Sequence, residues 1–263
     1  MTLHLPTLLM ALTLASGVLA GAVLAVSWGS RLHKGLSLWG LGLVVNALSY
    51  PAFGLRDAGL LGVSIVLTNA LTALSLVTHT LALMAFQRGR CDTLPRWVVW
   101  LPAGLNLLAA VALLHDDRWR NVCVAGLQAA LALVLLSQAW APGLHGRRLT
   151  GRWVVIVGAS LLFLSLLART GSMLGASDWD IQFNVPTQVQ VATYFAVLAV
   201  LLLNSMGFVL MQMEHAVSQQ HELASHDRLT GLHLGRRLER GQPAVGQATH
   251  PLELTGGAAP EPH

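Results

Sequence analysis

The chain has 263 residues, of which 54% are hydrophobic and 11% are charged, and its formal net charge is +4. A soluble domain carries about 25% charged residues and a disordered chain has low hydrophobicity, so this composition excludes both classes. The mean hydropathy of +0.60 indicates an integral membrane protein. The basic residues lie between apolar runs, where membrane topology places them. We therefore expect the lipid bilayer as a partner and no nucleic acid.

Seven runs are apolar and long enough for membrane-spanning helices, which need about 20 such residues each. Leu, Ala and Val dominate the runs without the alternation that barrel strands show. The predicted fold class is therefore all-α, a polytopic membrane protein with seven transmembrane helices and a cytoplasmic helical stalk. The seven runs are residues 5–27, 35–55, 60–86, 97–114, 122–142, 153–175 and 189–213.

The first run has two interpretations, a cleaved signal peptide or an uncleaved first helix. No Lys or Arg precedes it, and it is longer than the apolar region of a signal peptide, which has roughly 7–15 residues. Arg31 and Lys34 follow it instead. We therefore expect an uncleaved helix.

Lys and Arg are distributed unevenly over the connections between the runs. The connections after the first, third and fifth runs hold eight, and those after the second, fourth and sixth hold three. Because basic loops stay in the cytoplasm, this bias predicts a multi-pass membrane protein with its N-terminus outside and its C-terminus in the cytoplasm. The eight are Arg31, Lys34, Arg88, Arg90, Arg96, Arg147, Arg148 and Arg152, and the three are Arg56, Arg118 and Arg120.

Reporter fusions after Met213 test this orientation. We expect a fluorescent protein fused there to fluoresce and alkaline phosphatase to stay inactive, because the phosphatase needs disulfides that form outside the cytoplasm. Strong phosphatase activity from the fusion would contradict the predicted topology.

The third run contains a stripe of polar residues. Thr68, Thr72, Ser75 and His79 follow one another at spacings of 4, 3 and 4 residues, which places them on one face of a helix. Such a stripe can line a ligand cavity, with His79 as a proton or metal site, or it can hydrogen-bond to neighbouring helices. We expect the second role and no metal, because a lone His is a weak metal signal.

Arg169 lies near the predicted outer end of the sixth run. A buried Arg in a membrane is costly and is normally paired. Asp178 and Asp180 follow in the next connection, so one interpretation is an outer ion pair among these residues. The other is that the Arg169 side chain extends to the membrane interface.

The polar segment after Met213 continues the last run. Apolar residues recur there at roughly heptad spacing, at Met206, Met213 and Val217. A helical stalk over 214–226 can therefore pair with a second copy as a short coiled coil, which gives a homodimer through the last helix and stalk. Gln220 occupies one of the core positions, and a frayed helix end is the alternative.

The next segment, from residue 225 to 237, reads Ser-His-Asp-Arg-Leu-Thr-Gly-Leu-His-Leu-Gly-Arg-Arg. It resembles the opening of the GGDEF domain of bacterial diguanylate cyclases, which typically reads Asp-x-Leu-Thr-Gly-Leu-x-Asn-Arg-Arg. Leu234 and Gly235 depart from this pattern, in which the family usually has Asn and the first Arg. The matching residues are Asp227, Leu229, Thr230, Gly231, Leu232 and Arg236.

The membrane region resembles, more loosely, a seven-helix sensor region that precedes such domains. The similar residues are Leu38-Trp39-Gly40, Leu55-Arg56, Ser64-Ile65-Val66-Leu67 and Asn69. The resemblance implies a sensory module of cyclic di-GMP signalling in the bacterial inner membrane. In such a module a signal shifts the last helix, and the stalk controls whether two cyclase domains meet. A small-molecule transporter or channel is the alternative, although no run has a central Pro-Gly break and no inverted repeat is visible. The sequence does not identify the ligand.

The catalytic part of such a domain is not recognisable in the chain. Joining two GTP molecules needs carboxylates that hold Mg²⁺, which the family takes from its Gly-Gly-Asp/Glu-Glu-Phe turn, whereas two alanines follow Gly256-Gly257 here. We expect no catalytic residue, no metal site and no cofactor, with Mg²⁺ and GTP bound only by an intact relative. The expected segments are a sensory module over 1–213, a signalling helix over 214–226, a remnant of the GGDEF-domain start over 227–240 and a disordered tail over 241–263.

We accordingly predict no diguanylate cyclase activity. The purified protein, given GTP with Mg²⁺ or Mn²⁺, is expected to yield no cyclic di-GMP above a no-protein control, because no carboxylate pair is placed to hold two metal ions. Turnover that survives repurification and is abolished by Asp227→Ala would contradict this prediction.

Overall fold

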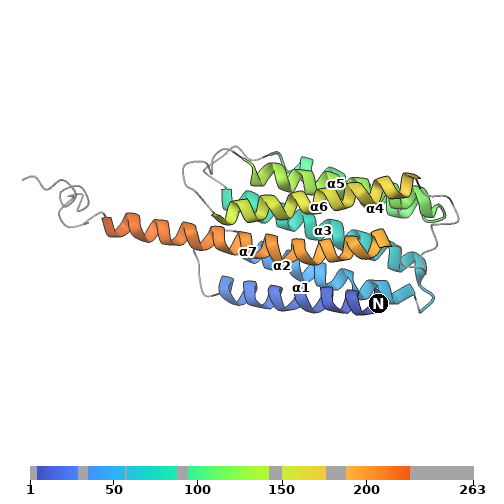
Figure 1. Ribbon diagram of the computed structural model, residues 1–263, viewed down its shortest axis with the longest axis horizontal. Coiled ribbons are helices and arrows are strands. Elements are labelled where there is room, and N and C mark those ends of the chain that lie inside the picture. Colours follow the sequence, from blue (N-terminus) through green and yellow to red (C-terminus); the bar gives the residue numbers. More distant parts are fainter. Residues whose placement is uncertain are drawn as a thin grey trace, which may run out of the picture. The chain divides into compact units, whose positions relative to one another are not determined.

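The regular structure of the described residues is entirely helical, as the predicted fold class requires. Six helices are long and apolar enough to cross a membrane, and Figure 1 shows them side by side. Residues Met1–Val217 form one compact unit and Ser218–His263 a second. The computed structural model describes residues 5–28, 35–56, 58–87, 94–141, 150–175 and 188–225.

Seven α-helices and one 3₁₀ helix make up the described part of the chain. They are α1 (Leu5–Trp28), α2 (Leu36–Ser49), η1 (Pro51–Arg56), α3 (Leu61–Gln87), α4 (Trp97–Ala112), α5 (Asp117–Ala139), α6 (Thr150–Gly175) and α7 (Gln188–Ser225).

Helix α4 is shorter than the other spans, so six rather than seven helices meet the length expected for crossing a bilayer. Its 16 residues extend over about 24 Å, whereas a hydrocarbon core is about 30 Å thick. The predicted run continued to Leu114, but Leu113 and Leu114 belong to a turn. Asp116 follows this turn and caps α5.

Helix α5 begins five residues before the predicted apolar run. The Asp116 carboxylate accepts a 3.1 Å hydrogen bond from the Trp119 backbone N–H, and Asp117 forms an ion pair with Arg120 one turn later. Because capping satisfies an N–H group that has no partner within the helix, the helix starts inside a charged segment. Hydropathy alone does not reveal such a start.

The second predicted run is divided by Pro51. Helix α2 ends at Ser49, and the chain continues as the 3₁₀ helix η1, because proline lacks an N–H and its ring clashes with the carbonyl four residues earlier. The Ser64 hydroxyl of α3 donates a 2.7 Å hydrogen bond to the Ala52 carbonyl. This bond fixes η1 against the start of α3.

Consecutive helices from α1 to α6 pack against each other, and α3 also packs against α5. Helix α7 approaches α6 through glycines: a Cβ on Gly151 would lie 2.5 Å from the Gly207 carbonyl oxygen. It also contacts α2, since Trp39 Nε1 donates a 3.3 Å hydrogen bond to the Ser205 hydroxyl. Helix α7 is therefore in contact with both α6 and α2.

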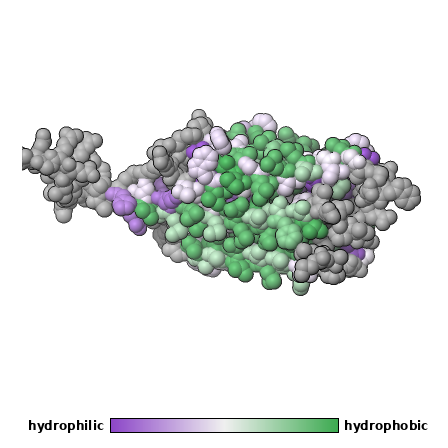
Figure 2. All heavy atoms as spheres, viewed as in Figure 1, coloured by the Kyte–Doolittle hydropathy of each residue, from purple (hydrophilic) through white to green (hydrophobic). Residues whose placement is uncertain are grey.

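The outer surface of the bundle is apolar, as a lipid environment requires. Met10, Leu14 and Val18 lie at helical spacing on one face of α1, with exposed fractions of 70%, 68% and 71%. Figure 2 shows apolar side chains over the middle of the visible face of the bundle. Continuous apolar surface of this kind is rare on soluble monomers, so these helices are those of a membrane-embedded protein.

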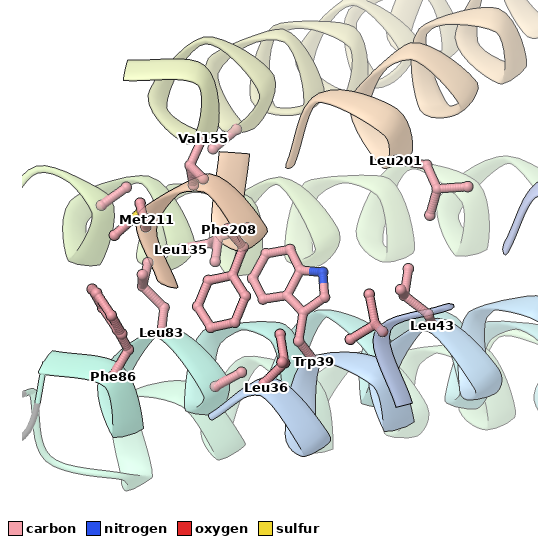
Figure 3. Packing of buried hydrophobic residues seen from close by; sticks show 14 of the residues in the cluster. Leu36, Trp39, Leu43, Leu83, Phe86, Leu135, Val155, Leu201, Phe208 and Met211 are labelled. Atoms are coloured by element: carbon pink, nitrogen blue, oxygen red, sulfur yellow. The ribbon is translucent and has the colours of Figure 1, made fainter. Parts of the chain in front are cut away.

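An aromatic cluster forms the centre of the core (Figure 3). The Trp39 ring lies flat on the Phe208 ring, with centroids 4.3 Å apart and an angle of 9° between the planes. Phe86 meets Phe208 edge-on at 6.0 Å, and His79 lies 4.5 Å from Trp39 on a tilted plane. The cluster thus joins α2, α3 and α7.

Candidate ligand cavity in the bundle

A cavity of about 150 Å³ lies inside the bundle, between α2, η1, α3, α5, α6 and α7. Along α7 its lining extends from Thr193 to Ser205, a rise of about 18 Å for an α-helix. A cavity of comparable size, about 150 Å³, binds benzene in another protein. The space is therefore sufficient for a small organic molecule.

The lining of the cavity is largely polar. Fifteen of its 26 residues have Asn, Gln, Ser, Thr, Tyr, His or Arg side chains. Polar side chains are costly at this depth and usually mark a binding site or a transport path when they face a cavity. The concentration of polar groups favours a ligand that forms hydrogen bonds.

All four residues of the predicted stripe on α3 line this cavity, namely Thr68, Thr72, Ser75 and His79. The Ser75 hydroxyl donates a 3.0 Å hydrogen bond to the Gly42 carbonyl of α2, which is the interhelical role expected from the sequence. The Thr72 hydroxyl bonds within its own helix, to the Thr68 carbonyl. The buried hydroxyl of Thr68 has no hydrogen-bond partner in the part of the chain that the structure describes.

Gly42 places the His79 ring at the cavity wall. A Cβ on Gly42 would lie 2.8 Å from His79 Nε2 and 2.6 Å from Thr78 Oγ1, so a larger residue would push α3 away from α2. Because glycine carries only a hydrogen in place of a Cβ, the His79 imidazole fits between Gly42 and the Trp39 ring. His79 therefore forms part of the inner wall together with Trp39.

Helix α7 contributes a second polar face that the sequence analysis missed. Thr193, Tyr194, Asn204 and Ser205 all line the cavity. The spacing of 11 residues between the two pairs corresponds to about three helical turns, so they share one side of α7. This spacing was a usable signal in the sequence, because polar pairs are rare in so apolar a run.

Asn204 also marks a close contact between α7 and α6. A Cβ on Gly158 would lie 2.2 Å from Asn204 Oδ1, so the amide packs directly on the α6 backbone. This oxygen is buried and has no hydrogen-bond partner among the described residues. A ligand that moves Asn204 would therefore act directly on the contact between the two helices.

Asn46 and Tyr50 of the α2 end were likewise not singled out in the sequence. The Asn46 amide donates hydrogen bonds of 3.1 Å to the Ser16 hydroxyl of α1 and to the Tyr50 hydroxyl. Both Asn46 and Tyr50 line the cavity. These bonds fix the orientation of their side chains at its edge.

Arg169 lies at the end of the cavity that Phe53 and Thr193 also line. It is half-buried, and within the described ranges it forms no ion pair. Asp178 and Asp180, its predicted partners, lie outside the described residues, so the outer ion pair stays a prediction.

The remaining predicted residues are not described by the structure. The GGDEF-like motif residues Asp227, Leu229, Thr230, Gly231, Leu232 and Arg236 lie outside the described ranges. Within those ranges no group of three His, Cys, Asp or Glu residues is placed to hold a metal ion.

The chain was compared with protein-family models, curated proteins and solved structures, and none of them matches it.

Proposed function

We propose that this protein is a membrane-embedded sensory module that binds a small molecule in the cavity and conveys its presence through α7. The observation that carries the proposal is the position of Trp39. This residue lines the cavity, and its ring is stacked on Phe208 of α7. A ligand that displaces Trp39 therefore pushes directly on the last helix.

The aromatic contacts continue from Trp39 toward the end of α7. Phe86 of α3 touches Phe208 edge-on at 6.0 Å and His215 edge-on at 5.9 Å. Because protein interiors are close-packed, a rotation of Phe208 changes the space available to Phe86 and in turn to His215. These contacts offer a route from the cavity to residues more than two helical turns further along α7.

Glu214 holds the same part of α7 against α6. Its carboxylate accepts hydrogen bonds from the backbone N–H groups of Thr150, at 2.9 Å, and of Gly151, at 3.4 Å. A carboxylate at a helix N-terminus is stabilised by the unpaired N–H groups and the helix dipole. The bond sets the resting position of α7, from which a ligand would have to displace it.

We propose that the output follows the family that the sequence resembles, the membrane sensors of diguanylate cyclases. Helix α7 is continuous from Gln188 to Ser225, so it joins cavity-lining residues to the segment just before the Asp227 motif. In this proposal α4 is the seventh span. The protein lies in the bacterial inner membrane with its C-terminus in the cytoplasm. Two copies pair through the last helix and residues 214–226. The chain itself acts as a sensor and not as an enzyme.

Filling the cavity tests the proposed ligand site. Ala125 of α5 lines the cavity and is 3% exposed, so Ala125→Phe places a ring in the ligand space. Ala112 is exposed on α4, and Ala112→Phe makes the same change where only lipid is expected. We propose fluorine NMR in nanodiscs with 4-fluorobenzyl alcohol as the probe.

We expect the probe to bind to the original chain and to the Ala112→Phe variant and to be excluded by Ala125→Phe. Circular dichroism and gel filtration confirm that each variant is folded. Saturable binding that is the same in the Ala125→Phe variant would contradict a ligand site in this cavity.

A further inference from the structure

We infer that the ligand of this cavity is a small organic carboxylate and that Arg169 binds its carboxylate group. This inference rests on the proposed function, since it names the ligand class of the same cavity. Within the described part of the chain, Arg169 is the only Arg, Lys, Asp or Glu among the lining residues.

Among the described lining residues, a single Arg without a carboxylate suits an anion and disfavours a cation. The guanidinium group has five N–H donors in a plane and forms paired hydrogen bonds with a carboxylate. Such bonds are stronger in a low-dielectric interior than in water. The half-buried Arg169 is placed where it can form them, because it borders both the cavity and the end of the bundle.

A second arginine lies near Arg169 among the described residues. Arg56 lies within electrostatic range of both Arg169 and Arg120. The acidic residue in this group is Asp117, and it is already paired with Arg120. Nearby charges of one sign attract ligands of the opposite sign, so Arg56 adds to the attraction of Arg169 for an anion.

The remaining walls define the body of the ligand. On the α6 side the cavity is bounded by Leu162 and Leu166, and on the α3 side by the polar stripe that ends at His79. The Trp39 ring also lines the cavity, and its flat face suits a flat apolar group. With a volume of about 150 Å³, the cavity holds a body about the size of a benzene ring. The ligand is therefore a compact monocarboxylate, with one apolar side and one side that accepts hydrogen-bonding substituents.

Three probes that share one ring separate charge from shape: benzoate, benzamide and benzylamine. We propose calorimetric titration of each into the full chain in nanodiscs at pH 7. Benzoate is expected to bind more tightly than benzamide, and benzylamine most weakly, because only benzoate gains the charge-assisted bond to Arg169.

The variant Arg169→Gln is expected to weaken benzoate binding by about tenfold or more and to leave benzamide binding within about twofold. Arg169→Lys retains the charge without the paired geometry. Its affinity for benzoate is therefore expected to lie between those of the original chain and of Arg169→Gln. The matched control is Arg118→Gln. It removes one charge from the same end of the bundle, where the Arg118 side chain donates to the Leu174 carbonyl outside the cavity lining.

Two results would overturn the ligand class: benzamide or benzylamine binding as tightly as benzoate, or benzoate binding that is unchanged by Arg169→Gln. In either case 4-fluorobenzyl alcohol would still bind and be excluded by Ala125→Phe, and the proposed sensory function would stand. If benzoate does not bind at all, the carboxylate proposal fails. If the neutral probe also fails to bind, the cavity is not a site for ligands of this size.

Discussion

Trp39→Ala is expected to lower the free energy of unfolding by about 3–5 kcal/mol, the usual cost of truncating a large buried aromatic residue. The Trp39 side chain is only 1% exposed and contacts the rings of Phe208 and His79. Its removal also leaves the Ser205 hydroxyl without the hydrogen bond from Trp39 Nε1. Neighbouring side chains from three helices would have to move to refill the space. Unfolding in mixed micelles, followed by circular dichroism, measures the change.

Trp97→Ala is the matched control for this substitution. Trp97 is 64% exposed at the start of α4, so its removal leaves no buried void and is expected to change stability by about 0.5 kcal/mol or less. Equal losses for the two variants would show that the Trp39 cluster does not hold the bundle together. In the sensory proposal, Trp39→Ala also uncouples α7 from the cavity.

Gly151→Leu is expected to separate α6 from α7. A Cβ on Gly151 would lie 2.5 Å from the Gly207 carbonyl oxygen and 2.6 Å from the Met211 backbone nitrogen. Both contacts are with backbone, which cannot move aside as a flexible side chain does. Overpacking of this kind costs about 1–3 kcal/mol or more, and we expect a loss at the upper end of that range together with a broken bond between Glu214 and the N–H of residue 151.

Gly171→Leu on the same helix provides the control, because a Cβ on Gly171 would meet no atom of another described segment within 4 Å. This variant is expected to be as stable as the original chain or more stable by up to about 1 kcal/mol, since glycine is a poor helix former. The same unfolding titration compares the two variants. A tolerated Gly151→Leu would mean that α6 and α7 do not pack through these glycines.

The positions of the helices could be predicted largely from the sequence, because each span has to satisfy its own backbone in lipid and so appears as an apolar run. The errors lie at the ends. Pro51 divides the second run, and the Asp116 cap starts α5 within a charged segment. Both depend on local hydrogen bonding, to which an average of hydropathy is insensitive. Six of the seven predicted spans are helices long enough to cross a bilayer, and α4 is a shorter apolar helix.

The candidate site was predictable only in part. A helical stripe is a local pattern, so Thr68 and His79 could be placed on one face of α3 from their spacing alone. The same two residues line one cavity together with Asn204 of α7. This arrangement depends on how helices far apart in the sequence pack, which a local pattern does not show. The glycines behave in the same way: Gly158 is visible in the sequence, but its contact with Asn204 is not. Arg169 could be identified from the sequence because a buried arginine is costly in a membrane. Its position in the cavity lining is known only from the structure.

The central claim is that occupancy of the cavity moves α7 relative to α6. Paired spin labels measure this movement most directly, with Trp153→Cys on α6 and Val217→Cys on α7, both at exposed positions, in a chain whose two natural cysteines, Cys91 and Cys123, are replaced by Ser. Saturation with 4-fluorobenzyl alcohol is expected to shift the distribution of distances between the labels, and Ala125→Phe is expected to abolish that shift. Identical distributions with and without the bound probe would contradict the claim.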